Sequence, residues 1–106
     1  MAQTLKEKVT AHLKETVGLG DSDVAELLAL GQGVVAQALK DFPALLQAAD
    51  LLALAEAAHA LKGNLLNMGL DDLAELAKAI EAGAKTGDLD LVRVNVEGLE
   101  SALAQF

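Results

Sequence analysis

The stretch LLALAEAAHALKGNLLNMGL, residues 51–70, decides the fold class of this chain. Apolar residues recur in it at steps of four, three, four and three: Leu54, Ala58, Leu61, Leu65 and Met68. This spacing places them along one face of an α-helix, which has about 3.6 residues per turn. A helix with one apolar stripe has to bury that stripe against other elements. The stretch therefore predicts a helix that faces the core of a bundle.

The composition points to helices throughout the chain. Of the 106 residues 53% are hydrophobic, but only 2% are aromatic, and there is a single proline. A core made mainly of leucine, alanine and valine favours helices over strands. About a hundred residues is the usual size of one domain. We therefore expect one all-α domain, residues 1–106, in which residues 1–20 form an N-terminal capping helix and residues 22–106 form the bundle.

The charge argues against two kinds of partner. The formal net charge of -8 and the isoelectric point near 4.5 disfavour nucleic acid, because such binding relies on lysine and arginine. They disfavour an anionic membrane surface for the same reason, and no apolar stretch reaches the roughly 18 residues of a membrane span. The absence of cysteine suits a reducing compartment. We therefore expect a cytoplasmic protein that binds neither nucleic acid nor membranes.

Capping boxes predict where helices begin. In such a box, an oxygen-bearing side chain and a glutamate three residues later satisfy two free backbone amides. Three such pairs occur: Thr4 with Glu7, Asp23 with Glu26, and Asp72 with Glu75. The first predicted helix runs to about Val17. Within the second, Gly31, Gly33 and Pro43 predict a bend or break.

Turn residues and apolar spacing set the later boundaries. Residues 48–50 predict a short turn, and Gly69 predicts a helix end in the left-handed conformation. The helix after it is expected to bury four apolar side chains: Leu73, Leu76, Ala77 and Ile80. The segment VRVNV, residues 92–96, alternates as a strand does. A longer apolar pattern at helical spacing instead predicts a last helix from about Leu89 to Gln105.

His59 lies off the buried stripe of its helix. On a helical wheel it is more than a third of a turn from the centre of the stripe, so the imidazole should reach solvent. Its neighbours one and two turns away are small, apolar or cationic: Ala55, Lys62 and Gly63, then Leu52 and Leu66. Such a ring is a nucleophile that another protein can approach. Lys62 is placed to neutralise an anion on the ring, and Gly63 lets a partner backbone come close.

The segment AHALKGNLLNMG, residues 58–69, resembles a known signature. The signature is His-x-Leu-Lys-Gly-x5-Gly, which marks the histidine-containing phosphotransfer domains of phosphorelays. The matching positions are His59, Leu61, Lys62, Gly63 and Gly69. With its flanking helices, the resemblance covers about residues 34–103. It implies an antiparallel four-helix bundle, to which this chain adds an N-terminal helix.

The resemblance also implies roles for individual residues. His59 would be the phosphoacceptor and would exchange a phosphoryl group with the aspartate of a receiver domain. Lys62 would stabilise the phosphate, and Glu81, on the next helix, would orient the imidazole. Further residues would form the docking face for the partner and the end of the histidine helix: Gly63, Ala55, Leu52, Leu66 and Gly69.

The implied partners are response-regulator receiver domains, a hybrid sensor histidine kinase, or both. Mg²⁺ would be bound in the receiver domain, and we predict no metal or other cofactor on this chain. The chain is too short to contain the ATP-binding domain of a kinase, so we expect a carrier, acting as a monomer. Leu65 and Leu66 stand where small residues are common in the family, which leaves the identity of the partner open.

Three other interpretations of the sequence compete with this one. The bundle could be an adaptor that binds a receiver or kinase domain without being phosphorylated. Glu56 and His59 have the Glu-x-x-His spacing of di-iron bundles, but such sites need a second copy, and none exists at His12, which we expect simply at the surface. GDSDVAEL, residues 20–27, resembles the serine motif of acyl carrier proteins, but leucine typically follows that serine, where Ser22 is followed by aspartate.

Overall fold

The computed structural model describes residues 3–106, and this part of the chain is built from helices without strands. The elements in order are α1 (Leu5–Ala11), the π-helix η1 (His12–Thr16), α2 (Asp21–Gln47), α3 (Leu51–Asn67), α4 (Asp71–Thr86) and α5 (Leu89–Leu103). The expected all-α fold with an additional N-terminal helix is confirmed.

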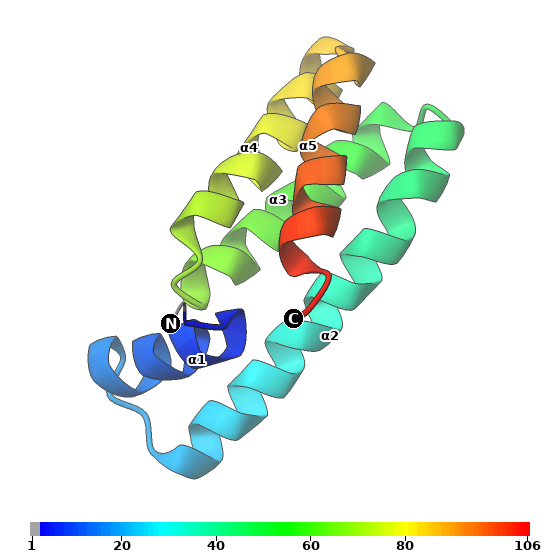
Figure 1. Cartoon of the computed structure of the whole chain (residues 1–106). Coiled ribbons are helices and arrows are strands. Elements are labelled where there is room, and N and C mark those ends of the chain that lie inside the picture. Colours follow the sequence, from blue (N-terminus) through cyan, green and yellow to red (C-terminus); the bar gives the residue numbers. More distant parts are fainter. Residues whose placement is uncertain (1–2) are drawn as a thin grey trace.

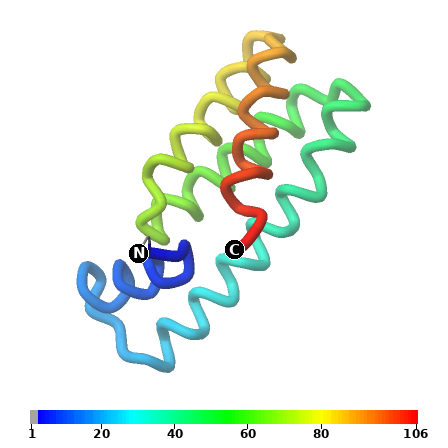
Figure 2. The backbone as a smooth tube through the Cα atoms, in the orientation of Figure 1, coloured from blue at the N-terminus to red at the C-terminus, as the bar shows by residue number. Residues whose placement is uncertain are grey.

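Helices α2 to α5 form an antiparallel bundle (Figure 1). Each runs in the direction opposite to the one before it, and α2 also packs against α5, which closes the bundle. The short α1 and η1 lie across one end, against the first half of α2 (Figure 2). The C-terminal segment returns to α2, where the side-chain amide of Gln32 donates a hydrogen bond of 2.6 Å to the backbone oxygen of Phe106.

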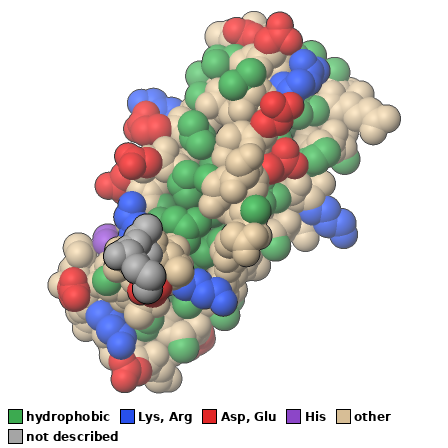
Figure 3. All heavy atoms as spheres, viewed as in Figure 1, with side chains coloured by type: hydrophobic (Ala, Val, Ile, Leu, Met, Phe, Trp, Pro, Cys, Tyr) green, Lys and Arg blue, Asp and Glu red, His purple; other side chains and the backbone are tan. Residues whose placement is uncertain are grey.

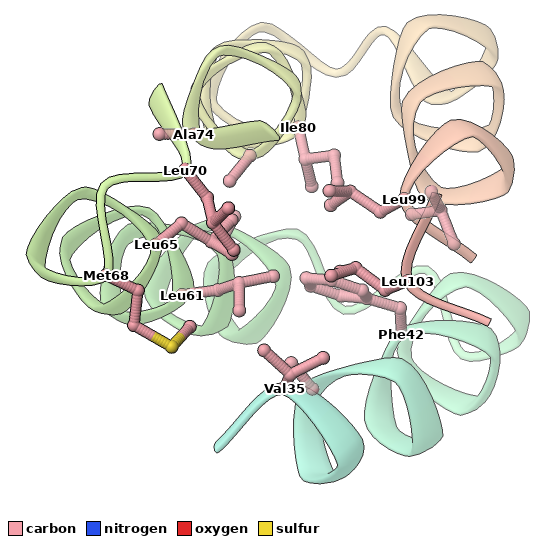
Figure 4. Packing of buried hydrophobic residues seen from close by; sticks show 14 of the residues in the cluster. Val35, Phe42, Leu61, Leu65, Met68, Leu70, Ala74, Ile80, Leu99 and Leu103 are labelled. Atoms are coloured by element: carbon pink, nitrogen blue, oxygen red, sulfur yellow. The ribbon is translucent and has the colours of Figure 1, made fainter. Parts of the chain in front are cut away.

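The core lies between the four long helices. The predicted stripe of α3 is buried along its whole length, and Figure 4 shows Leu61 and Leu65 pointing toward Leu99 of α5 and Phe42 of α2. Ala77 and Ile80 of α4 are fully buried, whereas Leu73 and Leu76 are partly buried at the edge of the core. Burial of one leucine-sized side chain contributes roughly 1.5 to 3 kcal/mol. The stripe of α3 therefore anchors the bundle.

One of the three predicted capping boxes is confirmed. The Thr4 hydroxyl accepts from the Glu7 amide at 3.1 Å, and a Glu7 carboxylate oxygen accepts from the Thr4 amide at 3.4 Å. The helix that begins there ends near Val17 as expected, although its last turn is a π-helix.

The boxes at Asp23 and Asp72 were wrong. Helix α2 begins at Asp21 after Gly20, helix α4 begins at Asp71 after Leu70, and neither has a side-chain cap. Helix α4 thus begins two residues earlier than the box requires, directly after the buried Leu70. The acidic side chains in these first turns still stabilise the helices, because they interact favourably with the positive end of the helix dipole. This interaction needs no capping hydrogen bond.

Of the bend or break predicted in the second helix, the break was wrong, because α2 continues from Asp21 to Gln47 with Pro43 inside it. Gly31 is buried where α2 packs on the end of α3, and an added Cβ atom there would clash with the sulfur of Met68. A helical glycine costs only about 1 kcal/mol relative to alanine. Here the close packing of α2 on α3 outweighs that cost, and Pro43 lies on the exposed side.

The predicted turns are confirmed. Ala49 has a φ of 51°, and the Asp50 carboxylate then caps α3 by accepting from the Ala53 amide at 3.1 Å. Gly69 ends the helical segment with a φ of 77°. The last helix is confirmed as well, but it ends at Leu103, two residues earlier than expected.

His12 is not simply at the surface, as the sequence had suggested. It is half-buried, and a Cβ atom added at Gly69 would lie only 2.5 Å from Cγ of its ring. The N-terminal segment therefore packs on the turn between α3 and α4. Glycine at position 69 leaves room for the His12 ring, and it also adopts the left-handed backbone conformation without strain.

Charged side chains lie on the surface of the molecule. Acidic and basic side chains lie mainly toward the edges of the face drawn in Figure 3, and hydrophobic side chains run between them along its length. Within residues 3–106 no helix is long and apolar enough to cross a membrane.

We predict that Phe42→Ala lowers the free energy of unfolding by about 3 to 5 kcal/mol, because a fully buried aromatic ring is replaced by a cavity. Chemical denaturation followed by circular dichroism measures this change. Leu30→Ala is the control, since Leu30 is 60% exposed and should change stability by no more than about 0.5 kcal/mol. Equal losses in the two variants would contradict the described core.

Candidate functional site

His59 lies in the middle of α3, on the side away from the core. Its side chain is 67% exposed, which confirms the prediction that the imidazole reaches solvent. The backbone there is held rigidly, because the neighbouring Ala58 and Leu61 are buried in the bundle. The ring is therefore presented outward from a fixed helix.

Glu81 of α4 lies beside the imidazole, at the place where the resemblance had implied it. Nδ1 of His59 and Oε2 of Glu81 are 3.0 Å apart. The Glu81 side chain is only 11% exposed, because α4 packs closely on α3 and buries Ile80 and Ala84 on the same face. The carboxylate is thus a nearly buried group that faces the exposed ring.

Two lysines complete this cluster. Nζ of Lys62 lies 3.0 Å from Oε1 of Glu81, and Nζ of Lys85 lies 3.2 Å from Oε2. The hydrogen bond from Lys62 is the main cause that lowers the pKa of Glu81 to about 2; Lys85 adds to this effect, and burial opposes it. The carboxylate is therefore ionised at neutral pH and acts only as an acceptor.

This contact assigns the tautomer of His59. Oε2 can only accept, so Nδ1 of a neutral ring must carry the proton that it donates. Nε2 then keeps its lone pair on the opposite edge of the ring. A histidine whose one nitrogen is held by a carboxylate has its ring orientation fixed. The arrangement thus offers a free nitrogen nucleophile to an approaching molecule.

The predicted docking residues fall into two groups. Leu52 and Leu66 are exposed two turns on either side of His59, and Gly63 is exposed next to it. Ala55 is buried at 8% exposure, yet it lines an open pocket of about 390 Å³ beside the ring. Gly69 instead forms the helix end that packs on His12. Four of the predicted docking residues therefore lie around His59: Leu52, Ala55, Gly63 and Leu66. Gly69 lies away from the ring and has a structural role instead.

Two features of the site were not predicted from the sequence. The ammonium group of Lys62, which we expect to neutralise an anion on the imidazole, is also paired with Glu81. Lys85 was missed altogether, although it lines the pocket beside His59. The signal was its position four residues after Glu81, a spacing that places opposite charges together on a helix.

No cluster for a metal ion is found among residues 3–106, where no three His, Cys, Asp or Glu side chains come together in a suitable way. Glu56, His59 and Glu81 line the same pocket, but the Glu81 carboxylate is already paired with Lys62 and Lys85. The chemistry available from these side chains is that of a nitrogen nucleophile with a carboxylate and two ammonium groups.

The described residues thus form an antiparallel helical bundle that presents an exposed histidine in contact with a carboxylate. The sequence model of the Hpt domain matches residues 20–106, further toward the N-terminus than the resemblance described above. The chain belongs to this family and is a histidine phosphotransfer domain of the phosphorelays of two-component signalling. Domains of this family interact with receiver domains and kinases. Comparisons with curated proteins and with solved structures gave no match.

The lowered pKa of Glu81 predicts how stability depends on pH. A carboxylate whose pKa in the folded state lies near 2, below its ordinary 4.5, contributes stability that is fully present above about pH 4.5. This contribution is lost as the pH falls toward 2. We expect the difference in unfolding free energy between the natural chain and Glu81→Gln to shrink over this range in denaturant titrations. A difference independent of pH would show that the carboxylate is not paired.

Gly63 gives a second prediction, because nothing lies within 4 Å of a Cβ atom added there. Alanine is a better helix former, so Gly63→Ala should raise the free energy of unfolding by about 0.5 to 1 kcal/mol in chemical denaturation. If a partner backbone approaches this position, the same variant should also bind a receiver domain several-fold more weakly in calorimetry. Stabilisation with unchanged binding would remove Gly63 from the docking face.

Proposed function

We propose that His59 accepts a phosphoryl group on Nε2 and donates it again, exchanging it with the aspartate of response-regulator receiver domains. The observation that carries this proposal is the 3.0 Å contact between Nδ1 and the ionised Glu81, which leaves Nε2 unprotonated and exposed. A buried histidine would offer no accessible nitrogen, and one held through Nε2 would leave Nδ1 free instead.

The transfer step follows from this geometry. The lone pair of Nε2 attacks the phosphorus of the aspartyl phosphate, the bond between phosphorus and the aspartyl oxygen breaks, and the aspartate leaves as a carboxylate. The ring keeps its proton at Nδ1 and gains positive charge as the new bond between nitrogen and phosphorus forms. Glu81 accepts from that N–H throughout, so its negative charge stabilises the developing imidazolium. The reverse reaction returns the phosphoryl group by the same path.

Lys62 is proposed to stabilise the phosphorylated product. Its ammonium group is one helical turn from His59 and has three N–H donors, of which Glu81 Oε1 receives one. The remaining donors are available to phosphoryl oxygens, and contacts between ionised groups are the stronger kind of hydrogen bond. The 25% exposure of its side chain fits a lysine that is held in place beside the ring.

The surroundings of His59 suit a docking receiver or hybrid-kinase domain. Exposed Leu52 and Leu66 supply apolar contacts along the outer ridge of α3, and Gly63 allows close approach between them. The Mg²⁺ used in the reaction would be held by the receiver domain. We further propose that the chain acts as a monomeric carrier, without kinase activity of its own, in the cytoplasm.

The test is incubation with a receiver domain phosphorylated on its aspartate, in the presence of Mg²⁺, comparing the natural chain with His59→Gln. We expect label on the natural chain that is stable in base and labile in acid, as phosphohistidine is, and none on the variant. His12→Gln is the matched control and should be labelled normally, because His12 packs at the end of the bundle.

Two other outcomes would count against the proposal. Label that persists in His59→Gln would place the phosphoryl group elsewhere. Several receivers that bind the chain but never label it would favour the adaptor interpretation, in which the same surface docks a partner without phosphorylation.

A further inference from the structure

Lys85 shares a single oxygen with the proposed phosphoacceptor. Its Nζ lies 3.2 Å from Oε2 of Glu81, and Nδ1 of His59 lies 3.0 Å from the same atom. Lys62, by contrast, contacts Oε1. Each oxygen of the carboxylate therefore has its own cation, and the oxygen that faces the ring is the one held by Lys85.

A carboxylate alone would be an unsuitable neighbour for a nucleophilic imidazole. An opposite charge nearby favours the charged form of a histidine, and an imidazolium has no lone pair on Nε2. Glu81 must therefore accept from Nδ1 without drawing a second proton onto the ring. A cation on the same carboxylate meets both requirements, because it offsets the negative charge while leaving Oε2 as an acceptor.

The other charged groups around the ring do not contact this oxygen. On α3 they are Glu56, which lines the same pocket, and Lys62, which is bound to the far oxygen. On α4, Lys78 is exposed one turn before Glu81 and forms no ion pair in the described part of the chain. On α2, Asp41 lies on the opposite side of α3, beside Ala60, and accepts from Gln37. Lys85 is thus the cation placed on the oxygen that the ring uses.

We propose that Lys85 is a positioning residue for the phosphotransfer reaction: it holds Oε2 of Glu81 toward Nδ1 and offsets the negative charge of this carboxylate beside the ring. This inference rests on the function proposed above. The lysine side chain is 64% exposed, so it does not serve the core. It acts through Glu81 and not by touching the phosphoryl group.

The test is the titration of the His59 ring by NMR in the natural chain and in Lys85→Met, together with the pH profile of phosphoryl uptake from a receiver. Both groups lie within 3.2 Å of Oε2, so the lost charge is no more than about 6 Å from Nδ1. Loss of a charge at that distance in water should move the midpoint of the ring titration up by about half a pH unit. The acidic limb of the uptake profile should move by the same amount.

Two matched variants complete the experiment. Lys85→Arg keeps the charge on Oε2 and should restore both curves. Lys78→Met removes the same charge from the same face of α4 without touching Glu81, and it should move the midpoint by less than half as much because of solvent screening.

The outcomes separate this inference from the proposed function. Unchanged curves in Lys85→Met would overturn the role of Lys85, and so would an equal shift in Lys78→Met, which would show only a general charge effect. A natural chain that takes up no phosphoryl group would instead defeat the proposed function. The ring titration would still report on the charge balance in that case.

Discussion

Burial of one stripe of α3 is the constraint on which the rest of this structure depends. The stripe faces α4, α5 and α2, and it turns the opposite side of the helix, with His59, toward solvent. Because an α-helix is rigid over this length, packing of the core fixes where the imidazole points. The same packing brings α4 against α3 and places Glu81 at the edge of the core, within reach of the ring. Fold and site are thus consequences of one interface.

The site is organised around an ionised carboxylate that is nearly buried. Leaving such a charge unpaired would cost several kcal/mol, so it must have partners. Lys62 of α3 and Lys85 of α4 neutralise this carboxylate. Its oxygen Oε2 also accepts a hydrogen bond from Nδ1 of His59. Folding has therefore already arranged the groups that a phosphoryl carrier needs. The proposed reaction at Nε2 requires no large rearrangement of this cluster.

Much of this structure was predictable, and the failures have physical causes. The stripe of α3, the left-handed Gly69, the Thr4 cap and the exposure of His59 follow from local spacing and backbone preference. The predicted boxes at Asp23 and Asp72 failed because first-turn acids stabilise a helix without capping it, and burial of Leu70 decided where α4 begins. The expected break in α2 failed at Gly31, where packing against Met68 outweighs a weak propensity. Such contacts join residues far apart in sequence, and local patterns do not contain them.

The sequence by itself determined the helical class, the face of α3 that is buried and the histidine that is exposed, since all three depend on periodicity within one segment. It also contained the motif that relates this chain to its family. Only the tertiary structure decided that Lys62 pairs with Glu81, that Lys85 shares Oε2 with His59, and that His12 packs on Gly69. Each of these depends on how two elements approach one another to within about 3 Å. Helical spacing can place a side chain on a face, but packing between helices selects its partner.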